Sequence, residues 1–167
     1  MPEPHETLSI FAEVSVALAG FSGIAIAFGS RSLGSLSRLE VRRLSNLFTL
    51  AGMALLTSLL MISLLYLDLA SHDILWRGGS ALLLVVAGPW LAWDVVRVTR
   101  LEQSERAEVK RSILYIFDSL AVGVLVLQLV NVIYIVAPWP FFLALTLAVA
   151  GAFQQFILLV RMGIREA

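Results

Sequence analysis

The sequence predicts an all-α integral membrane protein with five transmembrane helices. Hydrophobic residues make up 59% of the 167 residues and charged residues only 14%, against roughly 45–50% and 25% in soluble domains. Five apolar stretches come close to or exceed the length of about 20 residues that crosses the hydrocarbon core of a bilayer. Together these stretches and their loops use up the chain, so residues 1–167 form a single membrane domain.

The first two spans are predicted over residues 8–29 and 46–67. The first has no basic region before it and no small-residue cleavage site after a short apolar core, so it is a retained helix and not a signal peptide. The motif Ser37-x-x-Glu40 is a capping box. It predicts that the second helix begins at Arg38 and extends into the cytoplasm before it enters the membrane.

The remaining spans are predicted over residues 79–96, 113–136 and 141–160. The third is the shortest. Glu102 and Arg106, four residues apart, favour a cytoplasmic extension of the fourth helix. The turn over residues 137–140 contains two prolines and is so short that the fourth and fifth helices must be antiparallel neighbours.

The basic residues predict the orientation. If the N-terminus lies outside and the C-terminus in the cytoplasm, eleven of the twelve Lys and Arg residues lie inside, as the positive-inside rule requires. Their cytoplasmic clusters are expected to contact anionic lipid headgroups. Aromatic residues fit the same orientation. At the outer ends lie Tyr66, Trp76, Tyr134 and Trp139, and at the inner ends Trp93 and Tyr115.

One short run carries a weak resemblance. Residues 17–24, Ala-Leu-Ala-Gly-Phe-Ser-Gly-Ile, resemble helices of small bacterial membrane proteins of unknown function. The resemblance covers one helix and implies no activity. With the charge asymmetry, it favours a bacterial cytoplasmic membrane as the location.

Several classes of function are disfavoured by composition. The chain has no cysteine, and both histidines, His5 and His72, lie outside the apolar stretches. No metal site, cofactor site or catalytic motif is predicted. A formal net charge of zero argues against nucleic-acid binding.

A face of small residues runs along the first span. These residues are Ser15, Ala19, Gly20, Gly23 and Ala27. Such faces let membrane helices approach closely, within one chain or between copies, so self-association is expected. A pore-lining helix is the alternative. Glu13 lies about 20° from Gly20 on the helical wheel, which predicts that its carboxylate faces protein.

The polar residues of the spans fall into two layers. Glu13 forms the outer layer, and its candidate partners are Gln128 and Asn131 or, in an oligomer, Glu13 of adjacent copies. The inner layer contains Asn46, Asp94, Asp118, Gln154 and Gln155. On the fourth span, Asp118, Ala121, Leu125 and Gln128 share one face. The simpler interpretation pairs Asp94 with Arg97 and Asp118 with Arg111 in salt bridges.

These layers predict a homo-oligomeric channel or channel-like permease for protons or small cations. Carboxylates and amides across a bilayer are the groups that such pathways use. The pathway residues would be Glu13, Asp94, Asp118, Gln128, Asn131 and Gln154. The alternative is a non-conducting scaffold or accessory subunit whose buried polar residues fix helix packing. An intramembrane sensor or effector is a third hypothesis, with less support.

Overall fold

The computed structural model describes residues 3–28, 38–67, 71–99 and 111–165. The described chain is all-helical. Its elements are α1 (Pro4–Phe28), α2 (Arg38–Leu67), α3 (His72–Thr99), α5 (Arg111–Val130), the π-helical turn η2 (Asn131–Ile135) and α6 (Pro138–Arg165).

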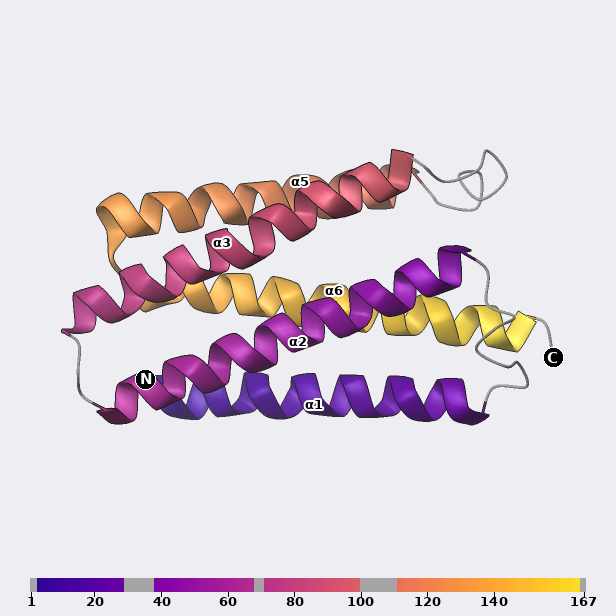
Figure 1. The fold of residues 1–167 in the computed structure, drawn as a ribbon, viewed down its shortest axis with the longest axis horizontal. Helices are drawn as coiled ribbons and strands as arrows, with labels where there is room; N and C mark the ends of the chain where they lie inside the picture. The colour runs from indigo at the N-terminus through magenta and orange to yellow at the C-terminus, as the bar shows by residue number, and fades with distance from the viewer. Residues whose placement is uncertain (1–2, 29–37, 68–70, 100–110, 166–167) are drawn as a thin grey trace.

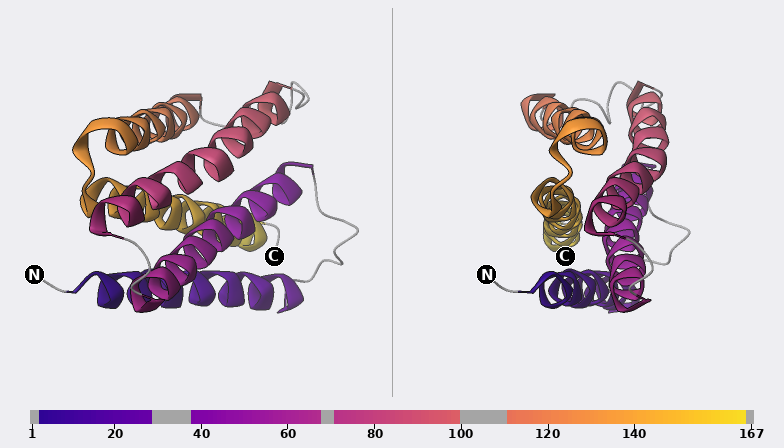
Figure 2. Two further views of the ribbon diagram at one scale, coloured as in Figure 1. Left: turned by 60° about the vertical axis from the view of Figure 1, so that its left-hand side comes forward. Right: turned by 90° about the vertical axis from the view of Figure 1, so that its left-hand side faces the viewer.

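The helices alternate in direction along one common axis, as Figure 1 shows. Figure 2 shows α2 and α3 forming one layer and α5 and α6 a second layer beside it. Helix α1 lies at the edge of this four-helix unit, packed against α2 and α6. The starts of α2 and α5 and the ends of α3 and α6 therefore meet at one end, which is the predicted cytoplasmic end.

Four of these helices are long and apolar enough to cross a membrane. The segments are Glu40–Leu67, Asp73–Arg97, Ile116–Ile135 and Pro138–Arg161. Their outward surfaces carry exposed aliphatic side chains such as Leu56 and Val85, which suits contact with lipid chains. Helix α1 is not among these segments when the described residues alone are considered. Its span, and the five-span topology, stay predictions.

Helix α2 is helical from Arg38, eight residues before its apolar stretch, which agrees with the predicted early start. Helix α6 begins at Pro138, inside the predicted turn and three residues before the predicted span. Helices α5 and α6 pack together as antiparallel neighbours. Ser37 of the capping box and the predicted extension at residues 102–106 lie outside the described residues.

A hydrophobic core joins α1, α2, α3 and α6 near the predicted outer end. The indole of Trp76 is completely buried there, with ring centroids 5.9 Å from Phe141 and 5.6 Å from Phe142. The prediction that Trp76 belongs to the outer aromatic belt is therefore wrong, because its ring fills the space between helices. Tyr66, Tyr134 and Trp139 are exposed, as a belt requires.

Close helix contact in this core depends on Gly79. A Cβ atom at this position would lie 2.9 Å from the side chain of Met61 and 3.1 Å from the ring of Phe141. Both of those side chains are fully buried, so they have little room to move away. Glycine thus allows α3 to approach α2 and α6.

The connection between α5 and α6 is made by η2 and one strained residue. Val136 has φ 52° and ψ 51°, a left-handed conformation that β-branched residues rarely adopt. Its backbone N–H donates to the carbonyl oxygen of Asn131 at 3.1 Å. A π-turn closed by a left-handed residue lets the chain reverse within a few residues.

Candidate functional site

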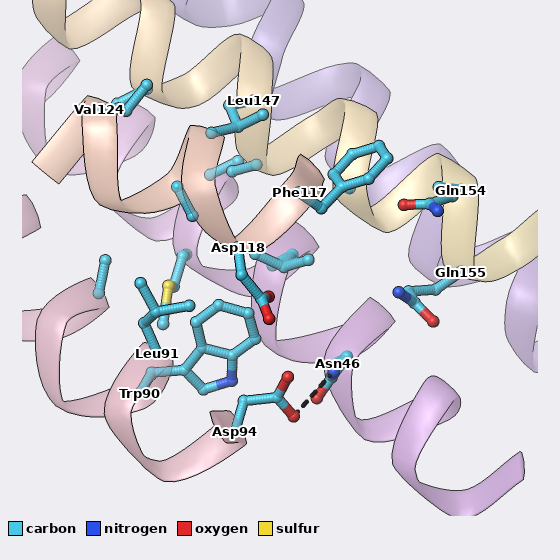
Figure 3. Close-up of a pocket in the computed structure, with 18 of the residues that line it drawn as sticks. Asn46, Trp90, Leu91, Asp94, Phe117, Asp118, Val124, Leu147, Gln154 and Gln155 are labelled. Carbon is cyan, nitrogen blue, oxygen red and sulfur yellow. Dashed lines mark hydrogen bonds between the residues drawn. The ribbon is translucent and has the colours of Figure 1, made fainter. Parts of the chain in front are cut away.

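A cavity of about 340 Å³ lies between α2, α3, α5 and α6. Figure 3 shows its polar side chains at the end toward the starts of α2 and α5, and apolar side chains farther along. It reaches the surface at the exposed residue Arg161. The polar residues that line it are Arg42, Arg43, Asn46, Asp94, Asp118, Gln128, Gln154, Gln155 and Arg161. The whole predicted inner layer is therefore brought together in one cavity.

Asp94 is held by two residues of α2. The Nε and Nη2 atoms of Arg42 donate to its two carboxylate oxygens at 3.0 and 2.6 Å, and Nδ2 of Asn46 donates to Oδ1 at 3.1 Å. The side chains of this ion pair are 10% and 8% exposed. We call Arg42, Asn46 and Asp94 the buried ion cluster. All of its hydrogen bonds link α2 to α3, so its evident role is to fix the packing of these helices.

The expected partner of Asp94 was wrong. Arg97 lies instead over the ring of Trp93, 5.6 Å from its centroid, and its Nη1 is 3.5 Å from the hydroxyl of Ser45. Arg42 was missed because 52 residues separate it from Asp94, and only the packing of α2 on α3 brings them together. The signal in the sequence was the early start of α2, which carries Arg42 to the level of Asp94.

Asp118 behaves differently from Asp94. It lies on α5 and points into the cavity toward the buried ion cluster (Figure 3), close enough for the charges of Asp94 and Arg42 to act on it. Within the described part of the chain it makes no hydrogen bond and no ion pair. The side chain of Arg111, its partner in the simpler interpretation, lies outside the described residues. Asp118 therefore faces the cavity without an ion-pair partner among the described residues.

Gln128 lies at the far end of the same cavity and is completely buried. Its Nε2 donates to the carbonyl oxygen of Pro140 at 2.7 Å, while its Oε1 has no hydrogen-bond partner. Ala121 and Leu125, predicted to share its face with Asp118, also line the cavity. Ten residues of helix place Gln128 about 15 Å beyond Asp118. One face of α5 thus runs along the cavity from a carboxylate to an amide oxygen.

Gln154 and Gln155 project from α6 toward the same space (Figure 3). Both are partly buried and make no hydrogen bond with other described residues. Each amide offers donors as well as an acceptor. Their oxygens can therefore contact a cation, and their N–H groups can donate hydrogen bonds to an anion.

Asn131 lies outside the cavity lining and serves the helix connection. Its Nδ2 donates to Oγ of Ser80 at 2.8 Å and to the carbonyl oxygen of Ala137 at 3.0 Å. Its Oδ1 accepts from the backbone N–H of Ala137 at 3.0 Å. The side chain is fully buried. Asn131 thus links α3, η2 and the start of α6, and we call this set of three hydrogen bonds the Asn131 clamp.

Of the two arrangements expected for Glu13, the one within a single chain is not found. Its side chain is exposed on the outside of α1, where the hydroxyl of Ser9 donates to Oε1 at 3.3 Å. The expected pairing with Gln128 or Asn131 is not formed, because α1 packs on α2 and α6, whereas these two amides bond to α6 and α3. Helix α1 packs on α2 and α6 through a different face. That buried face consists of Leu8, Ala12, Ser15, Leu18 and Ser22.

The small residues of α1 divide between two surfaces. Ser15 is buried against the chain, with its hydroxyl donating to the carbonyl of Phe11 at 2.7 Å. Gly20 and Gly23 are exposed, and a Cβ atom at either would meet nothing within 4 Å. Ala19 is partly buried, and the side chain of Ala27 lies outside the described residues. The glycine part of the small face is therefore open, on the same exposed side as Glu13.

The described residues contain no group of three or more His, Cys, Asp or Glu side chains that could hold a metal ion. No family model, curated protein or solved structure matches this chain. A function must therefore be inferred from the cavity itself, which combines an unpaired carboxylate and unsatisfied amide oxygens with apolar walls.

Proposed function

We propose that the protein is a channel-like permease for protons or small cations, and that the cavity between α2, α3, α5 and α6 is the inner half of its pathway. The observation that carries this proposal is the carboxylate of Asp118, which lines the cavity and makes no hydrogen bond or ion pair with another described residue. A charged side chain within a membrane span costs about 2.5–3.5 kcal/mol on insertion scales, so unpaired ones are retained mainly where they contact a substrate or water. The carboxylate of Asp94, by contrast, already accepts hydrogen bonds from Arg42 and Asn46.

The other unsatisfied atoms of the cavity support a positively charged substrate. The oxygens of Asn46 and Gln128 are both buried acceptors without partners. Carboxylate and amide oxygens replace the hydration shell of a cation or pass on a proton. Asp118 and Gln128, at two levels of one helix face, would be the pathway residues, with Gln154 beside them.

The remaining parts of the proposal follow from the charge pattern. The chain would cross a bacterial cytoplasmic membrane five times, with the N-terminus outside, and its basic residues would contact anionic headgroups. Exposed Arg161 at the cavity mouth and Arg38 at the start of α2 agree with a cytoplasmic position for that end. No catalytic reaction is proposed.

The test is proton flux into liposomes that contain the purified protein. We expect flux above that of empty liposomes, and we expect Asp118→Asn to reduce it to the empty-liposome level because the exchangeable carboxylate is lost. Asp73→Asn, at an exposed carboxylate at the start of α3, is the matched control and should conduct like the parent protein. Equal flux through the parent and Asp118→Asn proteins would remove Asp118 from the mechanism.

Self-association is the second part of the proposal, and it concerns the open surface of α1. An exposed carboxylate in a span needs a partner, and Gly20 and Gly23 beside Glu13 would let a second copy approach closely. Glu13 residues of adjacent copies would then form the outer site. Within a single chain, Glu13 does not join the cavity.

Leucine substitutions separate assembly from folding. Because Gly20 and Gly23 have open space around them, Gly20→Leu and Gly23→Leu should leave the single chain folded while they block the approach of a second copy. Gly78→Leu is the control, since Gly78 is equally exposed and open but lies on α3. Light scattering in detergent should give a smaller particle mass for the two α1 variants only. An identical mass for all four proteins would rule out this interface.

A non-conducting scaffold or accessory subunit is the second candidate function. The buried ion cluster and the Asn131 clamp favour it, because both use polar residues to hold helices together. A stable, correctly assembled protein that gives no flux in liposomes would favour the scaffold over the permease.

A further inference from the structure

The cavity contains acceptors that its own chain leaves unused. We infer that it binds an apolar molecule that carries a protonated primary amine, with the ammonium group at Asp118 and the apolar part directed toward Gln128. This inference names a substrate class and rests on the proposed function, since it uses the same cavity.

The orientations of the two unsatisfied amides are fixed by their neighbours. Nδ2 of Asn46 donates to the carboxylate of Asp94, and Nε2 of Gln128 donates to a backbone carbonyl. Neither amide can be turned around, because its oxygen would then face another acceptor. Both residues are at least nine-tenths buried, and both free atoms are oxygens. The carboxylate of Asp118 is therefore the acceptor that faces the cavity, and the oxygens of Asn46 and Gln128 are further unpartnered acceptors buried behind the cavity lining.

The acidic group available to a cation is Asp118. The guanidinium of Arg42 already donates to both oxygens of Asp94, whereas Asp118 has no ion pair with another described residue. Arg43 and Arg161 also line the cavity, so the attraction for a cation is confined to the surroundings of Asp118.

Asn46 and Asp118 point toward the same space beside the indole of Trp90 (Figure 3). Phe117 lies next to Asp118 in the lining. Aromatic faces near a carboxylate stabilise ammonium groups by cation–π attraction.

The remainder of the cavity suits an apolar body. Between Asp118 and Gln128 the walls are formed by aliphatic side chains from all four helices, among them Met53, Leu83, Leu91 and Val124. This stretch extends over about 15 Å along α5. A small hydrated ion would leave these walls unused, whereas an extended alkyl chain would cover them.

A primary amine is preferred over other head groups for a specific reason. Its ammonium has three N–H donors, which can bond Asp118 and Asn46 together. A quaternary ammonium carries the same charge without any N–H donor. A carboxylate would be repelled by Asp118 and would leave the amide oxygens unpaired.

The test is equilibrium binding of radiolabelled dodecylamine to the protein in phosphatidylcholine nanodiscs, with binding to protein-free nanodiscs subtracted. Phosphatidylcholine has no primary amine that could compete. We expect saturable binding that Asp118→Asn weakens by about tenfold or more, the loss expected for one charge-assisted hydrogen bond. Asp73→Asn, at an exposed carboxylate at the start of α3 and outside the cavity lining, is the control and should bind like the parent protein.

Competition with unlabelled compounds of equal chain length completes the test. Dodecylamine should displace the label, whereas dodecyltrimethylammonium and dodecanoate should displace it weakly. Equal affinity of the parent and Asp118→Asn proteins, or equal competition by dodecanoate, would overturn the inference. Equal competition by dodecyltrimethylammonium would overturn the requirement for N–H donors. Amine binding without proton flux would overturn only the proposed permease, and Asp118-dependent flux without amine binding would overturn only this inference.

Discussion

Asp94→Asn is expected to lower the free energy of unfolding by about 3–5 kcal/mol, the usual cost of removing one partner from a buried ion pair. The substitution keeps the size of the side chain but removes the negative charge that faces Arg42. The guanidinium, only 10% exposed, would remain buried without a counter-charge. Thermal and denaturant unfolding in detergent, followed by circular dichroism, would measure the loss.

Asp118→Asn is the matched control for this experiment. It makes the same chemical change on a neighbouring helix in the same cavity, but Asp118 has no ion pair to lose among the described residues. We expect its unfolding free energy to stay close to that of the parent protein. Similar destabilisation by both substitutions would contradict the assignment of a structural ion pair to Asp94 and of no such pair to Asp118.

A double substitution tests the cause. Replacing Arg42 with Met and Asp94 with Leu removes both charges and keeps apolar volume, and such exchanges often cost little. The double variant should therefore be more stable than Asp94→Asn alone. If the double variant were less stable than Asp94→Asn, the ion pair would itself stabilise the protein, and the loss in Asp94→Asn could not be attributed only to an unpaired buried charge.

The sequence predicted the inner half of the molecule well because its signals there are local. A capping box marks the start of α2, and two prolines mark the turn before α6. Depth along each predicted span placed Asn46, Asp94 and Asp118 at one level, and the structure brings them into one cavity. Helix boundaries and depth depend on nearby residues, so they can be read from one chain.

Side-chain partners were harder to predict because they depend on which helix faces which. The helical wheel put Glu13 beside small residues, but it could not tell which part of that surface the other helices cover. In the structure they cover the face of Ser15 and Ser22, and they leave Glu13 and Gly20 exposed. Glu13 and Asn131 share a depth, yet their helices are on opposite sides of the unit. The depth of a residue in its span could not identify its partner without knowledge of which helices are neighbours.

The same limit applies to the two inner carboxylates. Both have a basic residue nearby in sequence, so both looked equally able to form a salt bridge. The packing of α2 on α3 gives Asp94 a bidentate partner, and Asp118 faces open space from the other layer. Their different roles arise from tertiary structure alone.

Asn131→Ala is the second substitution with a large expected effect. The amide of Asn131 makes three hydrogen bonds, to Ser80 and to both backbone groups of Ala137. Its loss leaves three polar groups without their partner, and each such group costs about 1–3 kcal/mol where it is buried. It also frees the turn that holds Val136 in a left-handed conformation, which itself costs about 1–3 kcal/mol. We therefore expect a marked fall in unfolding temperature.

Ser80→Ala provides the graded comparison, because it removes one of those three hydrogen bonds and leaves the turn clamped. Unfolding temperatures should fall in the order parent protein, Ser80→Ala, Asn131→Ala. Val136→Gly should partly restore the stability of Asn131→Ala, since glycine adopts positive φ without steric cost. If Ser80→Ala were as destabilising as Asn131→Ala, the contribution of Asn131 would lie in its bond to α3 and not in holding the turn.

Proton flux through Asn131→Ala, measured below its unfolding temperature, should match the parent protein, because the side chain lies outside the cavity lining.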